Sequence, residues 1–463
     1  MVTSEDNGSD WRHPELWDTP GRIRKELACT MAHIYSHGMT TTSGGNMSVI
    51  DGLGNIWITP SGTDKGSMKP DDVVCIYPDG TVEGLYSPSM EHPMHSEVYR
   101  ARPDIRAIIH AHPPLLTSFS ISHRVPDTSV VRGWQELCGT TGYAGYATPG
   151  SSGVTENVAE EFRKGHNAVI MENHAVVVGG GDLAEALARL ETLENCAITI
   201  HAAGFVGDVV VPPVPENSSG SPATGNSSGS PATGNRSGPP ADGSSRSGNP
   251  SATVSPGEDS LAEEICMIAA RACSRGLIYG FCGTVSARST GNRFLMTPDG
   301  TAGWVLKKED IIRVGGSDTG GAIDNLPGSW LHDEIYKRFP SAGSVIVAQP
   351  PYLMAFAVRH KEIDVRTIPE SWLLLREMPS VPFGAAIPGR EELFEKLSEG
   401  YRAVIIFNEG IVVTGDNLLQ AFDRLEVAEM TAMSLILARS LGRIHPIDGE
   451  KINDLDKKFQ YKY

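Results

Sequence analysis

Apolar residues recur at helical spacing near the start of the chain. Pro20 follows Thr19, a favourable N-cap residue, and Gly38 is a common stop signal, so the segment between them is predicted to be a helix. A second amphipathic helix is predicted to begin at Asp182. The apolar faces of these helices consist of Ile23, Leu27, Met31 and Ile34 in the first and Leu183, Ala186, Leu187, Leu190 and Leu193 in the second.

Short apolar runs between these helices predict strands. The runs are residues 56–59, 73–77, 107–112, 168–171 and 175–178. They are rich in Val and Ile and are separated by turn-forming residues, which is typical of buried strands. Because helices and strands alternate along this part of the chain, the fold class is predicted to be α/β.

The same order of elements occurs a second time after residue 257. A nearly constant offset aligns the two copies: it is 238 residues at first, then 237 and finally 235. Aligned residues include Thr59-Pro60 with Thr297-Pro298, His95 with His332, and Arg189-Leu190-Glu191 with Arg424-Leu425-Glu426. The chain is therefore predicted to be a tandem duplication of one α/β unit.

The duplication predicts how the chain is divided. We expect a first domain at residues 18–210, a linker at 211–257, a second domain at 258–445 and a C-terminal tail at 446–463. The linker is almost entirely Ser, Gly, Pro, Asn, Ala and Thr, and its residues 217–225 are repeated as 226–234. With little apolar surface to bury, it is expected to be disordered. The tail is expected to be disordered as well.

Composition narrows the class of protein. A net charge of −17, with 40% apolar and 21% charged residues, is that of a globular protein and argues against nucleic-acid or anionic-membrane partners. The N-terminal residues do not resemble a secretory signal, and no run is long enough to span a membrane. The seven cysteines are scattered and form no C-x-x-C motif, which is typical of reduced thiols. We therefore expect a cytoplasmic protein.

Three histidines form a candidate metal site. His110 and His112 are two residues apart on a predicted strand, so both imidazoles should point to the same side of the sheet. His174 follows the end of another predicted strand. Zinc in catalytic sites takes three protein ligands and keeps one open position, which three imidazoles would provide. The alternative is a set of half-buried histidines that are satisfied by hydrogen bonds.

The second copy tests this interpretation. His110, His112, His174 and the nearby Glu91 align with Val347, Gln349, Glu409 and Gly328. All four candidates therefore change together, whereas His95 persists as His332. We infer that the four residues form one functional unit in the first copy and that His95 has a structural role.

Five motifs of the first half resemble those of a known family. They are Gly44-Gly45-Asn46-Met47-Ser48, Thr59-Pro60-Ser61-Gly62, Pro88-Ser89-Met90-Glu91, His110-Ala111-His112-Pro113 and Asn173-His174. In this order they resemble the class II aldolase/adducin family, with the L-fuculose-phosphate aldolases as the nearest enzymatic pattern, over about residues 20–205. The resemblance implies two α/β/α sandwiches around mostly antiparallel sheets, and oligomers with a four-fold axis and active sites between subunits.

The resemblance also implies an activity. The first domain is expected to be an aldolase-type lyase that acts on a small keto-sugar phosphate, with one Zn²⁺ per chain, or another divalent metal, on the three histidines. Zinc would polarise the carbonyl and stabilise the enediolate, and Glu91 would be the acid/base. Asn46, Ser61, Gly62 and Ser89 match the family's phosphate-binding positions. The alternatives are a helix-start carboxylate for Glu91 and ordinary turn chemistry for Gly44-Gly45-Asn46 and Pro60-Ser61-Gly62.

Two positions differ from the family's pattern. Met90 replaces a serine of the phosphate site, and no tyrosine lies near Val130 and Val131, where a neighbouring subunit would donate one. Decarboxylation of a 3-oxo sugar-acid phosphate and pentulose-phosphate 4-epimerisation on the same site remain alternatives, as does an adducin-like structural or interaction protein. The second domain, lacking the metal ligands, is expected to replace an identical neighbour, so two chains would form a pseudo-tetramer with two active sites.

Overall fold

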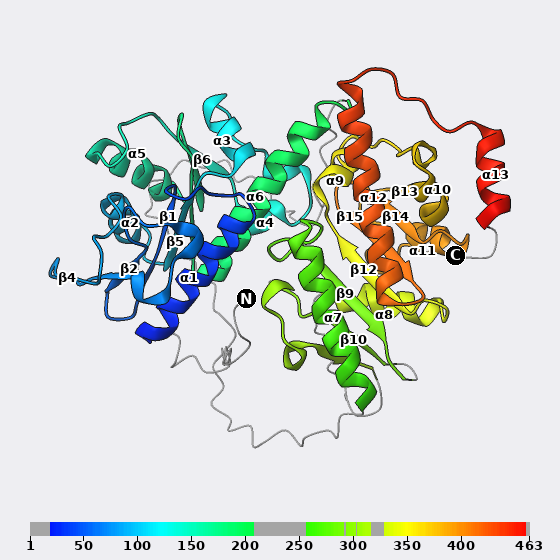
Figure 1. Cartoon of the computed structure of the whole chain (residues 1–463), viewed down its shortest axis with the longest axis horizontal. Coiled ribbons are helices and arrows are strands. Elements are labelled where there is room, and N and C mark those ends of the chain that lie inside the picture. The colour runs from blue at the N-terminus through cyan, green and yellow to red at the C-terminus, as the bar shows by residue number, and fades with distance from the viewer. Residues whose placement is uncertain (1–18, 208–255, 291–292, 302, 316–327, 460–463) are drawn as a thin grey trace, which may run out of the picture.

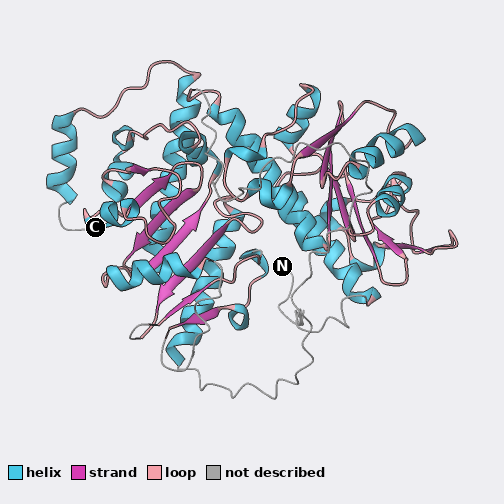
Figure 2. Cartoon of the chain, turned by 180° about the vertical axis from the view of Figure 1, so that it is seen from behind, coloured by secondary structure: helices cyan, strands magenta, loops and turns pink. Residues whose placement is uncertain are grey.

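The structure is a computed structural model that describes residues 19–207, 256–290, 293–301, 303–315 and 328–459. Nearly all of the predicted linker and residues 460–463 of the predicted tail lie outside these ranges. Each half forms a three-layer unit in which helices cover both faces of a sheet, and the two units lie side by side (Figures 1 and 2). The predicted α/β class and the tandem duplication are confirmed.

The sheet of the first half has eight strands in the order β4-β3-β2-β1-β5-β8-β7-β6. All neighbouring strands pair antiparallel except β6 and β7. The strands are β1 (Asn46–Ile50), β2 (Ile56–Ile58), β3 (Val74–Ile76), β4 (Val82–Glu83), β5 (Ala107–Ala111), β6 (Thr141–Ala144), β7 (Ala168–Met171) and β8 (Val176–Gly180). The register places Asn46 opposite His110, which brings two candidate site residues together across β1 and β5.

Helices cover both faces of this sheet. The helices are α1 (Pro20–Ser36), α2 (His92–Ala101), α3 (Pro114–Ile121), α4 (Trp134–Cys138), α5 (Ser152–Arg163) and α6 (Leu183–Ala203). On one face α1 and α6 pack on the side chains of Ile109 and Ile170. On the other face α2 and α5 pack on Ile108 and Val169, because successive strand residues point to opposite sides.

The second half repeats this architecture with a seven-stranded sheet in the order β11-β10-β9-β12-β15-β14-β13. Its strands are β9 (Gly283–Arg288), β10 (Phe294–Met296), β11 (Ile312–Val314), β12 (Ser344–Ala348), β13 (Ser380–Val381), β14 (Ala403–Ile406) and β15 (Gly410–Gly415). Its helices are α7 (Pro256–Ser274), α8 (Ser329–Arg338), α9 (Pro351–Ala357), α10 (Pro369–Leu375), α11 (Glu392–Ser398) and α12 (Leu418–Arg439). Strand for strand, β12 corresponds to β5 and β15 to β8.

Most predicted elements are confirmed within two residues. The opening helix begins at Pro20, and Asp182 caps α6 by accepting a hydrogen bond from the Glu185 amide. The prediction missed β1, which is only five residues long and follows a glycine-rich turn. The prediction of a disordered tail is wrong for α13 (Gly449–Phe459), whose Asp456 accepts a hydrogen bond of 2.8 Å from the Trp372 indole.

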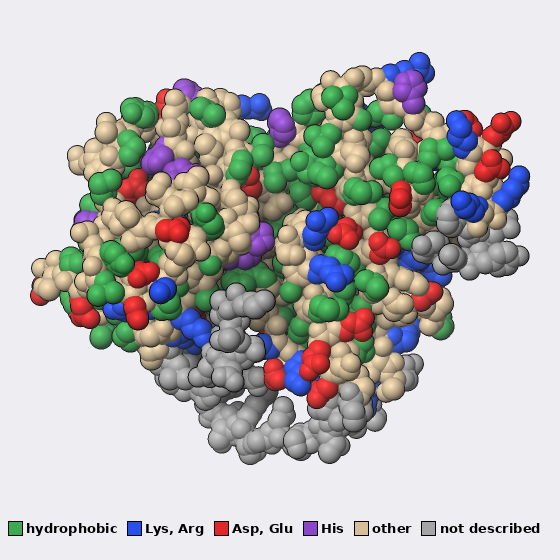
Figure 3. Space-filling view, viewed as in Figure 1, with side chains coloured by type: hydrophobic (Ala, Val, Ile, Leu, Met, Phe, Trp, Pro, Cys, Tyr) green, Lys and Arg blue, Asp and Glu red, His purple; other side chains and the backbone are tan. Residues whose placement is uncertain are grey.

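The two halves share a continuous apolar boundary. Helix α6 runs along it and packs against α9 (Figure 1). Val130, Trp134 and Val206 of the first half belong to the same buried cluster as the core of the second half. Charged side chains of both signs are scattered over the face shown in Figure 3, among hydrophobic and other residues. No helix among the described residues is long and apolar enough to cross a membrane.

Candidate metal centre and acid–base site

The three predicted metal ligands come together at one end of the first sheet. His110 lies on β5, His112 follows the last residue of that strand, and His174 lies in the turn between β7 and β8. One nitrogen from each ring lies within 4.8 Å of the other two. The two-residue spacing of His110 and His112, which predicted that both imidazoles point to the same side of the sheet, therefore brings the two rings together. The β7–β8 turn adds His174.

Backbone contacts orient two of these rings. His110 Nδ1 lies 3.0 Å from the Val176 carbonyl, so the N–H on Nδ1 donates there and Nε2 is left to face the cluster. His174 follows Asn173, which has a left-handed backbone (φ 53°). The backbone amide of His174 donates a hydrogen bond to the Ser120 hydroxyl at 2.9 Å. A sharp turn and a buried hydroxyl thus fix the position of His174.

The chemistry of the cluster fits a divalent metal. Burial, and next the charge of His110, lowers the pKa of His112 to about 3, and burial also lowers the pKa of His174. Both rings are therefore neutral at physiological pH, the form that binds metals. The Nδ1 atoms of His112 and His174 are buried and have no hydrogen-bond partner among the described residues. Such orphaned buried nitrogens require an explanation, and a bound ion supplies one.

Glu91 points into the cluster. It stands at the N-terminus of α2, and its Oε2 lies 3.2 Å from His110 Nε2 and 2.7 Å from Asn46 Nδ2. Burial by itself raises the pKa of Glu91, but the charge of His110 and the hydrogen bond from Asn46 outweigh burial, so the pKa lies below its usual value. The carboxylate is therefore ionised and placed beside the position that a metal would take.

A chain of hydrogen bonds holds Glu91 in place. Because Asn46 donates its amide N–H to Glu91, its oxygen accepts from His95 Nε2 at 2.6 Å. His95 Nδ1 then accepts from the Ser48 hydroxyl, which in turn accepts from the Tyr99 hydroxyl, both at 2.7 Å. His95 is fully buried, and burial lowers its pKa to about 3. Its contribution is to orient Asn46, which positions Glu91.

The second half keeps this series of hydrogen bonds but not its connection to a carboxylate. Tyr336, Ser286 and His332 repeat the same contacts, and His332 Nε2 then meets the Thr284 hydroxyl at 2.8 Å. Gly328 stands where the chain would reach a carboxylate. The buried network therefore belongs to the fold, whereas its connection to Glu91 belongs to the first half alone.

The predicted phosphate-binding residues lie close to Glu91. A β-bridge between Pro60 and Pro88 joins the turn that contains Ser61 and Gly62 to the segment that contains Ser89. Gly62 is exposed and has a left-handed backbone (φ 68°). Asn46 is buried, and its side chain is engaged with Glu91 and His95. The structure therefore brings all four residues to the site but shows Asn46 supporting the carboxylate.

Lys65 was missed by the sequence analysis. It begins η2 (Lys65–Ser67), is buried, and its ammonium group donates to the Pro60 carbonyl at 2.5 Å. Burial lowers its pKa to about 8, and it makes no ion pair with a carboxylate of the described chain. Gly303 takes its place in the second half, so the comparison of copies could have found it. A buried cation behind the Ser61–Gly62 turn favours an anion at that turn.

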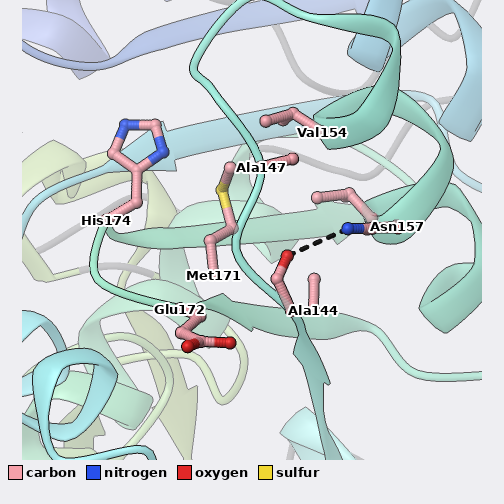
Figure 4. Close-up of a pocket in the computed structure, with 9 residues that line it drawn as sticks. Ala144, Ala147, Val154, Asn157, Met171, Glu172 and His174 are labelled. Carbon is pink, nitrogen blue, oxygen red and sulfur yellow. Dashed lines mark hydrogen bonds between the residues drawn. The ribbon is translucent and has the colours of Figure 1, made fainter.

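The enclosed space beside the cluster is small. A cavity of about 10 Å³ lies next to His174, and Figure 4 shows Met171, Val154 and Ala147 around it. The hydrogen bond drawn there joins Asn157 to the Gly145 carbonyl at 3.0 Å. Such a volume holds about one water molecule. A sugar-sized ligand must therefore approach the histidines from their open side, since His112 and His174 are only partly buried.

The corresponding place in the second half is a contact between the halves. We call Val347, Gln349 and Glu409 the relict site. The Trp134 indole donates to Gln349 Oε1 at 2.8 Å, and the Asn408 side chain donates to the Val130 carbonyl at 2.8 Å. A cavity of about 690 Å³ remains beside these contacts, with Arg132 and Gly133 of the first half in its wall.

Comparisons with known proteins agree with this geometry. The sequence model of the class II aldolase and adducin N-terminal domain matches residues 25–200 and again residues 263–436. The chain belongs to the class II aldolase and adducin family. Both halves are thus copies of one family domain, as the internal repeat predicted.

Several members of the family are similar to this chain. A 5-deoxy-D-ribulose 1-phosphate aldolase of Bacillus thuringiensis serovar kurstaki is 32% identical over 191 residues, which is 40% of this chain and 87% of that protein. An L-fuculose phosphate aldolase of Methanocaldococcus jannaschii is 33% identical over 38% of this chain and 93% of that protein. A 3-oxo-tetronate 4-phosphate decarboxylase of Escherichia coli K12 is 28% identical over 39% and 87%. Aldolases and decarboxylases therefore both occur among its relatives.

Proposed function

We propose that the first half is a metal-dependent lyase that cleaves or forms a carbon–carbon bond in a small keto-sugar phosphate. The observation that carries this proposal is the carboxylate of Glu91 at 3.2 Å from His110, within a cluster of three imidazoles. His110, His112 and His174 would hold one divalent ion, Zn²⁺ in the first instance. When bound, the ion would supply Lewis-acid stabilisation of the negative charge that develops on the substrate's carbonyl oxygen.

Glu91 is the proposed acid/base. Its carboxylate is ionised and held by Asn46, so it can take a proton from the substrate and return one to the carbon that the broken bond leaves electron-rich. The series of side-chain hydrogen bonds that leads from Tyr99 to Asn46 is buried and complete. The Glu91 carboxylate therefore does not have to reorganise when the substrate binds.

Recognition of a phosphate group is assigned to the turn beside Glu91. Ser61 and Ser89 offer hydroxyls, and Gly62 is exposed for a close approach of the backbone. Lys65 supplies a positive charge behind this turn, which partly offsets the loss of a serine at Met90. The named substrates of the relatives, which are sugar phosphates or a 3-oxo acid phosphate, support this assignment.

Decarboxylation is the second candidate. The Escherichia coli relative carries that name, and its identity to this chain is nearly as high as that of the aldolases. Both reactions leave electrons on a carbon next to a carbonyl group, so the same residues serve either one. An adducin-like structural role for the whole chain is disfavoured, because it gives no reason for a complete triad with Glu91 in one copy.

A screen of substrates tests the proposal. The purified, zinc-loaded protein is assayed against ketose 1-phosphates for aldehyde release and against 3-oxo acid phosphates for carbon dioxide release, with Glu91→Gln as the inactive control. Turnover of a ketose phosphate that Glu91→Gln abolishes is the expected result. Carbon dioxide release alone would select the decarboxylase, and no turnover of either class would contradict the proposal.

We further propose that the working unit contains two chains, with the second half replacing an identical neighbour at each contact. The intrachain boundary supports this, since the first half contacts the relict site through its residues 130–134. The surface that would join the two chains is identified next.

A further inference from the structure

The contact between the two halves of the chain uses a different surface on each half. The first half contributes α6, and the second half contributes α9, and the Thr199 hydroxyl of α6 donates to the Pro351 carbonyl at 3.1 Å. Because both halves have the same fold, each also carries the surface that its partner uses. In the second half the counterpart of α6 is α12, and in the first half the counterpart of α9 is α3.

The counterpart surface on α12 is apolar and exposed. Met430, Leu437 and Leu441 are 36%, 55% and 88% exposed. Met430 and Leu437 are seven residues apart and lie on one side of α12, and Leu441 follows the C-terminal end of that helix. At an offset of 235 they align with Asn195, Ala202 and Val206, which are only 7%, 1% and 8% exposed at the boundary. Ser434 also aligns with Thr199 and preserves its hydroxyl group.

The counterpart surface on α3 is exposed as well. Ile121 is 62% exposed, whereas Val358, which aligns with it on α9, is 0% exposed. Pro114 and Ser118 are likewise exposed, and their counterparts Pro351 and Ala355 are buried. We call Met430, Leu437 and Leu441 the α12 face, and Pro114, Ser118 and Ile121 the α3 face.

We propose that the α12 face binds the α3 face of a second copy of this chain and that this contact brings Glu370 of the second copy into the metal site. The proposal rests on the function proposed above and on the contact already present within one chain. Each chain offers both faces, so two chains can make two reciprocal contacts. A ring that closes in this way leaves neither apolar face exposed.

Internal symmetry identifies the residue that the second copy supplies. Asp127 and Asp364 cap equivalent turns, and each accepts a hydrogen bond from the amide two residues later. This fixes an offset of 237, which aligns Arg132 and Gly133 with Pro369 and Glu370. Arg132 and Gly133 line the cavity at the relict site. The same contact between two chains would place Pro369 and Glu370, both exposed at the start of α10, over the histidine cluster.

Charge determines which halves can meet in this way. Arg132 is ion-paired with Glu409 of the relict site, and Glu409 aligns with His174. An arginine over the histidine cluster would lie beside a bound cation and would be repelled. The neutral Pro369 at the equivalent position avoids that repulsion. The first-half segment therefore fits the relict site, and the second-half segment fits the metal site.

Glu370 would complete the proton transfers of a carbon–carbon cleavage. As the bond breaks, one group must take the proton of the substrate's hydroxyl, and another must give a proton to the carbon that keeps the electron pair. Glu91 is the group that gives the proton to the carbon. Glu370 of the second copy, a second carboxylate in the same site, takes the hydroxyl proton and releases it to water, while the ionised Glu91 takes up one proton from water and gives it to the carbon.

Sedimentation of the full-length chain tests the surface without any assay of activity. The wild type is expected to be a dimer, and Leu437→Glu with Leu441→Glu is expected to give monomers. Met267→Glu is the matched control: Met267 is 52% exposed on α7, and its counterpart Cys29 is also exposed, so neither copy buries this position. A monomeric wild type, or a double variant that stays dimeric, would overturn the proposal.

Complementation tests the role of Glu370. His110→Ala and Glu370→Gln chains are each expected to have little activity, with the KM of Glu370→Gln nearly unchanged. Coexpressed as a mixture, they form mixed dimers in which one site pairs an intact metal centre with an intact Glu370, so about a quarter of wild-type activity should return. Activity no higher than the mean of the two separate variants would show that Glu370 does not act across chains. If the wild type has no activity, the proposed function fails, while sedimentation still decides the surface.

Discussion

Arg132 of the first half and Glu409 of the second half form an ion pair, with 2.7 Å between Nη1 and Oε1. Glu409 aligns with His174, so one position of the fold holds a metal-ligand candidate in one copy and a partner for a neighbouring domain in the other. Residues 130–134 connect to the relict site through Trp134 and Gln349 as well. The position that offers a metal ligand in the first half is thus part of the boundary between the halves in the second half.

The Arg132–Glu409 pair should stabilise the boundary modestly. Arg132 is about half exposed, so solvent screens the pair, and a double-mutant cycle of Arg132→Met and Glu409→Gln is expected to give a coupling of about 1 kcal/mol. Glu156 and Arg163, an exposed pair within the first half, provide the control and should give less. Denaturant unfolding measures both cycles, and equal couplings would show that burial of Glu409 adds nothing.

Metal should bind to the first half alone. His110→Ala is expected to lower the metal content from about one ion per chain to nearly none, because zinc needs three protein ligands here. Val347→Ala, at the aligned position of the second half, should leave the content unchanged. Elemental analysis after dialysis gives the ratio. Equal metal content in the two variants, or two ions per wild-type chain, would contradict this assignment.

Glu91 should act in the chemical step. Glu91→Gln keeps the size and the contact with Asn46, so the metal is expected to stay bound while kcat falls by roughly 10²- to 10⁴-fold. Asn46→Ala should lower kcat less, because it only frees the Glu91 carboxylate from its support. Thr284→Ala is the control, since Thr284 occupies the position of Asn46 in the second half. A Glu91→Gln enzyme with unchanged kcat would remove Glu91 from the mechanism.

The Ser61 turn should discriminate for phosphate. Ser61→Asp reproduces the second half, where Asp299 stands at this position, and it is expected to raise the KM for a phosphorylated ketose more than about tenfold through charge repulsion. Ser61→Asn, of similar size and neutral, should raise it less. The unphosphorylated ketose serves as a second control. An equal loss with both variants would mean that charge at this turn is unimportant.

Acid should destabilise the second half through His332. Burial lowers the pKa of His332 to about 4, so between pH 6.5 and pH 4 the unfolded chain binds a proton that the folded chain does not. Stability is therefore complete above pH 6.5 and falls with pH, by on the order of 2 kcal/mol at pH 5 from this group.

His332→Asn tests that pH dependence. Asparagine keeps hydrogen-bonding groups near Thr284 and Ser286 but does not titrate. The variant should be less stable than the wild type at pH 7, with a shallower loss toward pH 5 in guanidinium unfolding. An unchanged slope would assign the acid sensitivity to other groups. His95, whose pKa burial lowers to about 3, adds a similar contribution in the first half.

Much of the site could be predicted because the chain contains its own comparison. His110 and His112 are two residues apart on a strand, and strand geometry alone places them on one side. Their simultaneous replacement by Val347 and Gln349 separated function from fold without any other protein. Lys65 could have been found by the same comparison, since Gly303 replaces it, but an isolated lysine has no periodic signal.

The sequence by itself determined the repeat, the α/β elements and the three histidines, because hydrophobic periodicity and ligand spacing are local properties of the chain. Only the tertiary structure decided that Arg132 meets Glu409, that Asn46 supports Glu91, and that the α12 and α3 faces are left exposed. These relationships depend on how surfaces distant in sequence pack together. Packing follows from the shape and burial of whole faces, which the local pattern of residues does not specify.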